Sequence, residues 1–328
     1  MAEHHWFFSK NPGHDFTRQH LGKLSFYDTM RLIISMGKGS TNDEIMDYFD
    51  LDPDLIPSQS AFCQRRRQIS LSAFEYLFSE FSSSFPSTTD KFKDHCILAC
   101  DGCHVVYATN SDIIEDYNKP RLIDYKGYNH MHLNGFVDVI SKAFLDVVIQ
   151  PGQQPDEREA LHSMLDHFTP DDPQKYIITA DRGYESYDLL FHCELKNLGY
   201  VFRVKSPSSP KSILSYYASE LPDDLEEFDV TIKRFFTDKA TNIMKSQSDV
   251  YRYINPSKNP PHFYELLRKN HSHLYFLQFR VVKIKTAGIS KTGNLFPPDS
   301  VQFRHFYRKR SGRRKPEKET GWQQQVSL

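Results

Sequence analysis

The chain has 328 residues, a formal net charge of −1, 39% apolar residues and 25% charged residues. At roughly 150 residues per domain this length suits about two domains, and 25 Phe with 18 Tyr supply bulk for a core, which excludes a wholly disordered chain. The charge balance excludes a uniformly basic coat, so any contact with nucleic acid must be local, and no run approaches the ~18 apolar residues of a membrane span. We therefore expect a cytoplasmic protein that does not contact membranes.

The N-terminal region is predicted to be helical. Apolar residues recur at helical spacing over residues 27–34, and the run stops at a Gly-Lys-Gly sequence. Thr41 precedes Glu44 by three positions, which is the pattern of a capping box, and Ser58 or Ser60 begins a further helix. Two short helices around a tight connection resemble a helix-turn-helix pair, a common DNA-binding motif.

Three consecutive arginines, Arg65, Arg66 and Arg67, lie on the second helix of this pair. They are candidates for contact with DNA phosphates or base edges, and the alternative is a solvated helix face. Residues 1–88 hold 8 Lys and Arg against 11 Asp and Glu, so only a local patch of this region can bind DNA.

The polar segment at residues 82–90, SSSFPSTTD, predicts a domain boundary. Residues 95–205 then contain two helical segments among strand-like ones. The strand-like segments are HCILACD, HVVYA, HLNGFVDVI, AFLDVVIQ, YIITAD and YVFRV. The first of these helices is expected to begin at Pro155, and the order is three strands, helix, strand, helix, strand. This order predicts an α/β fold with parallel strands in its second half.

Two aspartates are predicted to end strands of this sheet. Asp101 follows CILAC and precedes a glycine, whereas Asp181 follows YIITA and precedes Arg-Gly-Tyr. Ligands bind outside the carboxyl ends of the strands in such sheets, and adjacent strands lie about 4.8 Å apart, so the two carboxylates can share a divalent ion. Mg²⁺ favours this arrangement, with two ions serving phosphoryl transfer. The alternative is that each Asp caps a turn.

Several segments of the sequence resemble those of a known family. CDGCHV, KGYNHMHLNGFVDV, VVIQPGQ, TADRGYESYDL, YVFRVKS and SQSAFCQRRRQI are similar to sequences of IS4-like insertion-sequence transposases of the DDE group. The resemblance covers roughly residues 25–285. Its most specific part is the DRGY motif, whose first residue, Asp181, lies 80 positions after Asp101.

The resemblance implies an RNase H-like core with a mixed sheet in the order β-β-β-α-β-α-β, carrying a β-rich insertion and preceded by an all-α N-terminal domain. It makes Asp101 and Asp181 the catalytic residues and metal ligands, with Mg²⁺ or Mn²⁺, two ions in an intact relative, as cofactor. The implied activity is hydrolysis and strand transfer of phosphodiesters at the ends of an insertion sequence. The implied partners are DNA at the element ends and at the target. The resemblance leaves open whether the chain forms a homodimer. The expected divisions are a helical DNA-binding domain at 1–88, the first part of the core at 89–205, the insertion at 206–275, a returning core strand at 276–286 and a basic, disordered tail at 287–328.

The family's third ligand, a glutamate in the motif Tyr-x-x-Arg-x-x-x-Glu, has no counterpart here. Tyr307 and Arg310 keep the first spacing, but Arg314 stands where the glutamate belongs, and Glu265 precedes the returning strand. We therefore assign no third acidic ligand and expect a frame shift or truncation after about Lys285, which would impair catalysis. Two alternatives follow: a non-catalytic DNA-binding remnant or inhibitor of full-length transposase, and a host nuclease.

Three further basic residues lie near the expected active edge of the sheet. Arg182 follows the second aspartate, while Arg203 and Lys205 belong to or follow the last core strand. They are candidates for neutralising DNA phosphates, and pairing with nearby acids is the alternative. The chain has no Gly-rich phosphate loop and no Gly-x-Ser-x-Gly motif, so nothing supports an NTPase or a serine hydrolase.

Overall fold

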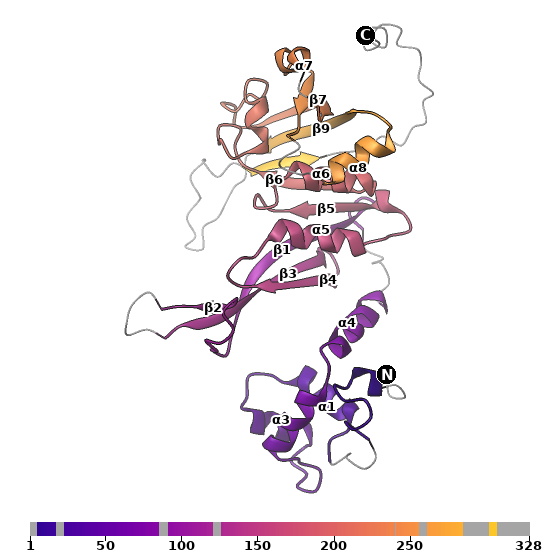
Figure 1. Cartoon of the computed structure of the whole chain (residues 1–328), viewed down its shortest axis with the longest axis vertical. Helices are drawn as coiled ribbons and strands as arrows, with labels where there is room; N and C mark the ends of the chain where they lie inside the picture. The colour runs from indigo at the N-terminus through magenta and orange to yellow at the C-terminus, as the bar shows by residue number, and fades with distance from the viewer. Residues whose placement is uncertain are drawn as a thin grey trace. The chain divides into compact units, whose positions relative to one another are not determined.

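The computed structural model describes residues 5–17, 23–84, 91–120, 126–239, 241–255, 261–284 and 302–306. The chain divides into two compact units, Met1–Pro86 and Ser87–Leu328, and the division falls within the polar segment at 82–90 (Figure 1). Within the described ranges, no helix combines the length and the apolar character needed to cross a bilayer.

The described part of the first unit contains one 3-10 helix and four α-helices. They are η1 (His5–Phe8), α1 (Phe26–Ser35), α2 (Thr41–Tyr48), α3 (Gln59–Gln68) and α4 (Ser72–Ser84). Each of α1, α2 and α3 follows a serine whose hydroxyl accepts a backbone N–H of the first turn, as N-cap serines do. The expected capping box at Thr41 is wrong by one position. Ser40 caps α2 and pairs with Asp43 three residues on, because Glu44 instead accepts two backbone N–H groups of the preceding turn.

Helix α1 holds this unit together because it contributes to both of the apolar clusters that lie around it. One cluster contains Phe16, Phe26, Met30, Ile69 and Ala73. The other contains Leu24, Leu32, Ile45 and Phe62. Helix α3 supplies Phe62, which is fully buried, so the arginines that follow it are carried on a helix anchored by its apolar side.

The second unit is built on a mixed ten-stranded sheet, which confirms the expected α/β class. Its strands are β1 (Cys96–Tyr107), β2 (Tyr117–Asn118), β3 (Tyr128–Asp138), β4 (Phe144–Pro151), β5 (Tyr176–Ala180), β6 (Gly199–Val204), β7 (Phe228–Thr237), β8 (Tyr251–Tyr253), β9 (Leu274–Ile284) and β10 (Gln302–Phe306). The order across the sheet is β2-β3-β1-β5-β6-β10-β9-β7-β8, with β4 paired to β3. Strands β1, β5 and β6 run parallel, whereas β3 and β4 run antiparallel to their neighbours.

Strand β1 differs from the prediction. The two strand-like segments HCILACD and HVVYA form one strand of 12 residues, which continues past Asp101 instead of ending there. The reason is tertiary: β3 pairs with β1 without a break from Leu98 to Tyr107, so β3 satisfies the backbone of β1 well beyond the aspartate. Between β4 and β6 the chain forms α5 (Glu157–His167), the 3-10 helix η3 (Pro173–Lys175), β5 and α6 (Tyr187–Leu195).

The part of the chain after β6 also differs from expectation. Residues 206–275 are mixed rather than β-rich, since β7 and β8 alternate with η4 (Ile213–Tyr217), α7 (Asn242–Ser246) and α8 (Pro261–Lys269). The expected returning strand, β9, pairs with β7 and β10 and does not adjoin β6. The expectation of a disordered tail from residue 287 is wrong for residues 302–306. They form β10, which pairs with both β6 and β9 and so covers two strand edges that would otherwise be open.

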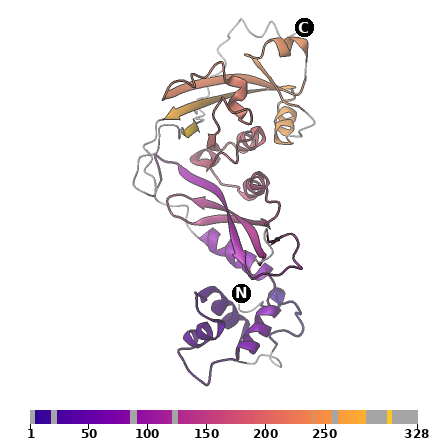
Figure 2. The same cartoon turned by 90° about the vertical axis from the view of Figure 1, so that its left-hand side faces the viewer.

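Helices α5, α6 and α8 lie side by side along the sheet (Figures 1 and 2). The largest apolar cluster fills the space beneath α5 and α6, with Leu98, Phe136, Leu161, Ile178 and Tyr200 among its members. A second cluster joins α6 and α8 to β7 and β9 through Phe191, Phe236 and Phe263. The helices are thus packed by burial of apolar surface on the sheet, the main favourable term in folding.

Three histidines stack where α5, α6 and α8 meet. Ring centroids lie 4.6 Å apart for His162 and His262, and 3.9 Å apart for His192 and His262. Burial lowers the pKa of His162 to about 4 and that of His192 to about 3, with neighbouring histidines adding to the effect on each ring. Both rings are therefore neutral at pH 7.

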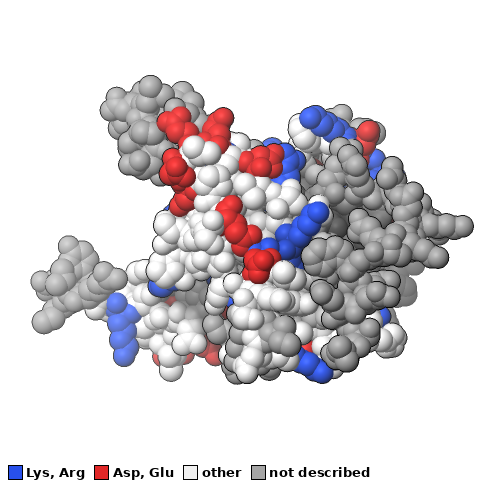
Figure 3. All heavy atoms as spheres, turned by 90° about the horizontal axis from the view of Figure 1, so that it is seen from above, with Lys and Arg blue, Asp and Glu red and all other residues white. Residues whose placement is uncertain are grey.

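Charges of both signs are interspersed on the end of the second unit that Figure 3 shows. This agrees with the formal net charge of −1 over the whole chain. A basic surface for a polyanion on the described part of that end would therefore be a local one.

Candidate active site

Asp101 and Asp181 occupy equivalent positions on two neighbouring parallel strands. The parallel register of β1 and β5 ends with the pair Cys100 and Ala180, and the two aspartates are the next residues along each strand. Both side chains are exposed. The expected placement of Asp181 directly after β5 is confirmed, whereas Asp101 lies within β1, opposite Gly135 of β3.

Local backbone contacts orient each carboxylate. Asp101 Oδ1 accepts the N–H of Gly102 at 2.9 Å, and Asp181 Oδ1 accepts the N–H of Gly183 at 2.6 Å. The turn after Asp181 is closed by a bond from Tyr184 N to Asp181 O at 3.2 Å. Tyr184 itself is fully buried, so its ring fixes the turn to the core. One oxygen of each aspartate is thus held by a backbone N–H close by in the sequence, and for Asp181, whose donor is two residues further on, this is the pattern of an Asx turn.

Two buried groups, Cys100 and Tyr184, lie beneath this edge of the sheet. Cys100 Sγ lies 3.5 Å from Tyr184 Oη beneath the two aspartates. Burial is the largest cause that raises the pKa of the Cys100 thiol to about 12, and burial raises the pKa of Tyr184 well above its usual value. The negative charges of Asp101 and Glu157 raise both pKa values further.

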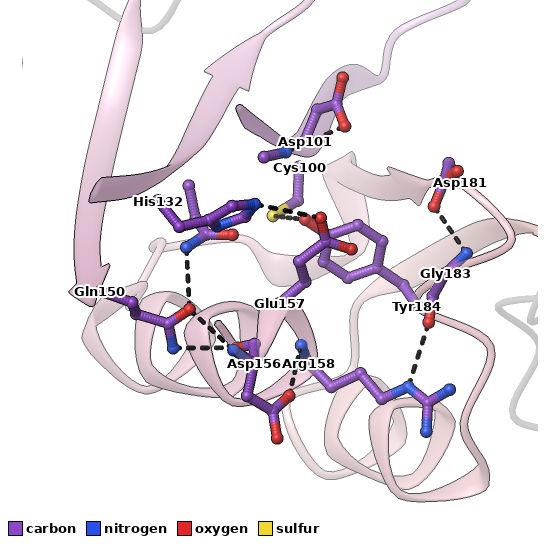
Figure 4. A network of polar contacts seen from close by, with 12 residues as sticks. Cys100, Asp101, His132, Gln150, Asp156, Glu157, Arg158, Asp181, Gly183 and Tyr184 are labelled. Atoms are coloured by element: carbon purple, nitrogen blue, oxygen red, sulfur yellow. Dashed lines mark hydrogen bonds and ion pairs between the residues drawn. The ribbon is translucent and has the colours of Figure 1, made fainter. Parts of the chain in front are cut away.

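A polar network that includes the buried His132 brings Glu157 to this edge of the sheet (Figure 4). Glu157 Oε1 lies 3.4 Å from His132 Nε2, and the His132 side chain is only 4% exposed. The other carboxylate oxygen, Oε2, lies 3.1 Å from where a Cβ on Gly183 would stand, and Asp181 Oδ1 lies 3.0 Å from the same point. The carboxylates of Glu157 and Asp181 thus border one small space, which only a glycine leaves open.

The start of α5 is tied into this network. Asp156 is the N-cap of α5 and accepts the N–H groups of Arg158 and Glu159, so the helix begins two residues after the expected Pro155. Gln150 of β4 bonds to the backbone of Asp156 in both directions, at 2.9 and 3.1 Å. Arg158 Nε donates to the carbonyl of Gly183 at 3.1 Å. These bonds couple the start of α5 to the loop that carries Asp181.

The residues at this edge fit a hard divalent cation. The two aspartates offer carboxylate oxygens from neighbouring strands, which is the donor type that Mg²⁺ and Mn²⁺ prefer. Beside them, His132 Nδ1 and Asn134 Oδ1 are buried and have no hydrogen-bond partner among the described residues. Buried polar atoms in this state are costly, and a bound ion with its waters is one way to satisfy them.

Sequence reasoning missed the contribution of His132, Asn134 and Glu157. A signal was present: His130, His132 and Asn134 alternate along β3, so they share one face of the strand, and all three are buried. Three polar side chains on the buried face of a strand need partners, and that requirement points to a functional network. The partner Glu157 is 25 residues further on, in the first turn of α5, where the helix dipole by itself also favours an acidic residue.

The three basic candidates near this edge have different environments. Lys205 Nζ lies 2.9 Å from Oε1 of Glu185, whose side chain is 1% exposed, so the alternative of structural pairing holds for Lys205. Arg182 is exposed in the loop after Asp181, and Arg203 is exposed on β6. The two exposed arginines have the better access to a phosphate, whereas Lys205, whose side chain is 32% exposed, is held by its ion pair.

The three consecutive arginines of the first unit also differ in their exposure to solvent. Arg65 is half-buried: its guanidinium lies 5.1 Å from the ring centroid of Phe16, and it donates to Gln68 at 3.1 Å. Arg66 and Arg67 are exposed. Successive helical residues point in different directions, about 100° apart, so three adjacent arginines do not share one face.

The missing third ligand falls outside the described residues, because Tyr307, Arg310 and Arg314 all lie beyond β10. Glu265 lies on α8 and pairs with Lys269 one turn away. Within the described ranges, three metal-ligand side chains converge at only one place, the cluster of His162, His192 and His262, which is separate from the two aspartates.

A model of the transposase DDE domain family matches residues 92–312. The chain belongs to this family. The match continues past Lys285, so the prediction that family sequence stops there is wrong. No curated protein matches the chain. Among solved structures, the chain is similar to a cryo-EM structure of the piggyBac transposase synaptic complex with hairpin DNA, with 11% identity and a TM-score of 0.38. That similarity covers 85% of this chain and 49% of the other, so this chain spans about half the length of that transposase.

Proposed function

We propose that the chain is a DNA transposase of the IS4-like DDE type, which hydrolyses and transfers phosphodiesters at the ends of an insertion sequence. The observation that carries the proposal is the register of β1 and β5, which sets Asp101 and Asp181 side by side at one edge of a mixed sheet. The family match over residues 92–312 supports the reaction class. The order β1-β3-β4-α5-β5-α6-β6 supports an RNase H-like core.

In this proposal Asp101 and Asp181 hold Mg²⁺ or Mn²⁺. Bound there, the metal would lower the pKa of an attacking water or hydroxyl and neutralise charge on the scissile phosphate. The protein keeps the carboxylates in place through the N–H groups of Gly102 and Gly183. Glu157 is a positioning residue, held by His132 beside Asp181. Arg182 and Arg203, both exposed, are the proposed phosphate contacts of this edge.

The first unit is proposed to bind DNA through the exposed arginines of α3. Helices α2 and α3 are consecutive, but residues 49–58 separate them, a longer connection than the three or four residues of a helix-turn-helix, so the tight connection expected from the sequence is wrong. Arg66 and Arg67 lie in the last turn of α3 and are exposed, so they can reach a phosphate backbone. The divisions at 1–88 and 89–205, with an insertion before β9, are part of this proposal.

The test uses a supercoiled plasmid that carries the gene with its native flanking DNA, incubated with the full chain and Mg²⁺ or Mn²⁺. Asp101→Asn and Asp181→Asn should each abolish cleavage at the element ends, because each removes a metal-binding charge without changing side-chain volume. Asp171→Asn is the matched control, since Asp171 is exposed near the opposite end of β5. Cleavage that survives in both site variants contradicts the proposal, and so does equal loss in the control.

The second candidate function is a non-catalytic DNA-binding remnant that inhibits full-length transposase. It is favoured by one observation, the arginine at position 314 where the family has its glutamate. This candidate predicts specific binding to the element ends, no turnover with either metal, and inhibition when the chain is added to an active relative. Turnover that Asp101→Asn abolishes would exclude it.

A further inference from the structure

Three histidine rings form a stack at the junction of α5, α6 and α8. His162 lies on α5, His192 on α6, and His262 is the second residue of α8. The plane of the His262 ring makes angles of only 8° with that of His162 and 11° with that of His192. The three side chains are 12%, 2% and 16% exposed, in the same order, so solvent reaches only the rim of this histidine stack.

Two carboxylates border the histidine stack. His192 Nε2 lies 3.1 Å from Asp166 Oδ1. Asp188 Oδ2 lies 2.8 Å from His262 Nδ1 and 3.4 Å from His162 Nε2. Asp188 Oδ1 also accepts the backbone N–H of His262 at 3.1 Å, so one carboxylate of α6 contacts both the ring and the backbone at the start of α8.

The contact between His162 and His192 limits the positive charge that the packed stack can hold. Their Nδ1 atoms lie 2.9 Å apart, so one of these nitrogens carries a proton and donates it to the lone pair of the other. If both rings were cationic, both Nδ1 atoms would carry protons and this hydrogen bond would be lost. Two positive rings with centroids 5.2 Å apart would also repel each other. The packed arrangement therefore requires that at least one of the two rings is neutral.

Burial also disfavours charge on these rings. It is the largest cause that lowers the pKa of His162 and that of His192, and His262 lowers both pKa values further. Lys196, which follows α6, acts in the same direction on His192. The groups that oppose this change at His162 are three carboxylates, Asp188, Asp166 and Asp156. These are the main charged groups around the two rings within the described ranges, and burial outweighs the carboxylates.

We propose that the histidine stack is an acid-sensitive latch, which holds the start of α8 on α5 and α6 at neutral pH and releases it in mild acid. Released rings meet water and accept protons freely, whereas the packed stack resists them, so acid favours the released state. The start of α8 depends on the latch because His262 contacts both Asp188 and the other two rings. The rest of the helix is held by the apolar side chains of Phe263, Leu266 and Leu267, whose burial does not depend on pH.

The direction of the pKa shifts sets the pH range in which the latch acts. An unfolded histidine has a pKa of ~6.5, and the pKa values of about 4 for His162 and about 3 for His192 lie below it. The stabilisation from the neutral rings is therefore complete above pH ~6.5 and is lost as the pH falls toward the lower folded values. Over this range each ring that is released and protonated raises the equilibrium constant for release by up to about tenfold per pH unit.

The test compares hydrogen–deuterium exchange of the full chain at pH 7 and pH 5, after correction for the intrinsic effect of pH on amide exchange. With two rings titrating, peptides from α8 should open roughly 100-fold more often at pH 5, whereas peptides from β1 and β5 should change little. His162→Gln replaces one titrating ring with a neutral amide that can still donate to His192, so the acid response of α8 should shrink by about tenfold. His167→Gln, which replaces an exposed histidine of α5, is the matched control and should keep the full response.

A second measurement keeps the test decisive if His162→Gln fails to fold. NMR spectra of the wild type with isotope-labelled histidine should show two rings that stay neutral at pH 5 in the folded chain, while exposed histidines titrate. The latch is overturned if every histidine ring titrates near pH ~6.5, if α8 exchanges equally at both pH values, or if His162→Gln keeps the full acid response. Exchange that rises equally in α8, β1 and β5 also overturns it, because acid would then unfold the whole unit.

Discussion

Gly102 is the position where the structure makes its sharpest prediction about the candidate site. A Cβ added to Gly102 would stand 2.4 Å from His132 Cε1, 2.9 Å from His132 Nε2 and 3.0 Å from Asn134 Oδ1. Carbon atoms in contact lie about 3.5–4.0 Å apart, so Gly102→Ala must displace the His132 ring by an ångström or more. The ring is 3% exposed and has no free path to solvent.

The expected cost follows from overpacking. Extra methyl groups in a packed core cost about 1–3 kcal/mol, and the displaced ring would also leave Glu157. In a unit of this size each 1 kcal/mol lowers the unfolding temperature by about 2–4 °C. A cost of 2 kcal/mol thus corresponds to a shift of about 4–8 °C.

Thermal unfolding of four chains measures this effect: the wild type, Gly102→Ala, His132→Ala and the double variant. Because the clash is with His132, Gly102→Ala should cost much less in the His132→Ala background than in the wild type, a coupling that a double-mutant cycle reports. Gly13→Ala is the control, since a Cβ there meets nothing within 4 Å. Gly102→Ala with wild-type stability, or strictly additive effects, would refute the described packing of β1 on β3.

Three other predictions test separate parts of the fold. Lys205→Met should destabilise the second unit, because it leaves the buried carboxylate of Glu185 without its ion-pair partner. Since Lys205 is 32% exposed, the loss should not exceed the ~3–5 kcal/mol of a fully buried pair. Adding Glu185→Gln should recover part of this loss, as measured by urea unfolding. The hydrogen bond from the Tyr107 hydroxyl is the largest cause that lowers the pKa of Asp116, and a bond from the backbone N–H of Gly152 is the next. The ionised carboxylate therefore stabilises the fold at pH values above the pKa of Asp116 in the unfolded chain. This contribution is lost as the pH falls through the lower pKa of the folded state. Tyr107→Phe should therefore be less stable than wild type at pH 7 and nearly equal to it in strong acid; equal stability at pH 7 would show that the bond contributes nothing. Replacing both exposed arginines of α3 with Ala should reduce the salt slope of DNA binding by about 0.9 per lost phosphate contact, and an unchanged slope would place the contact elsewhere.

Local signals sufficed for some elements and failed for others. Asp181 is preceded by a five-residue apolar strand and followed by turn residues, so its place after β5 could be predicted from six adjacent positions. Asp101 has the same kind of local sequence, yet β1 continues past it, because β3 supplies a pairing partner for the whole length. The serine caps of α1 and α3 are local in the same sense, whereas the choice of Ser40 over Thr41 depended on where Glu44 found its partners.

The network around Glu157 illustrates the part that could not be predicted. His132 and Glu157 meet because β3 adjoins β1 and α5 packs over that sheet, and neither fact is contained in the residues around them. Strand β10 is similar: residues 302–306 lie in a stretch with few aliphatic residues, and they form a strand because β6 and β9 offer free edges on both sides.

From its amino acids alone, this chain could be assigned to the DDE transposases, with its alternation of strands and helices and its two aspartates. Those properties reside in contiguous residues, where apolar periodicity and turn chemistry act over a few positions. Tertiary structure decided three other features: the register that aligns Asp101 with Asp181, the buried partner of Glu157 and the meeting of three histidines. They depend on contacts between residues far apart in the chain, whose free energy is gained only once sheet and helices have packed.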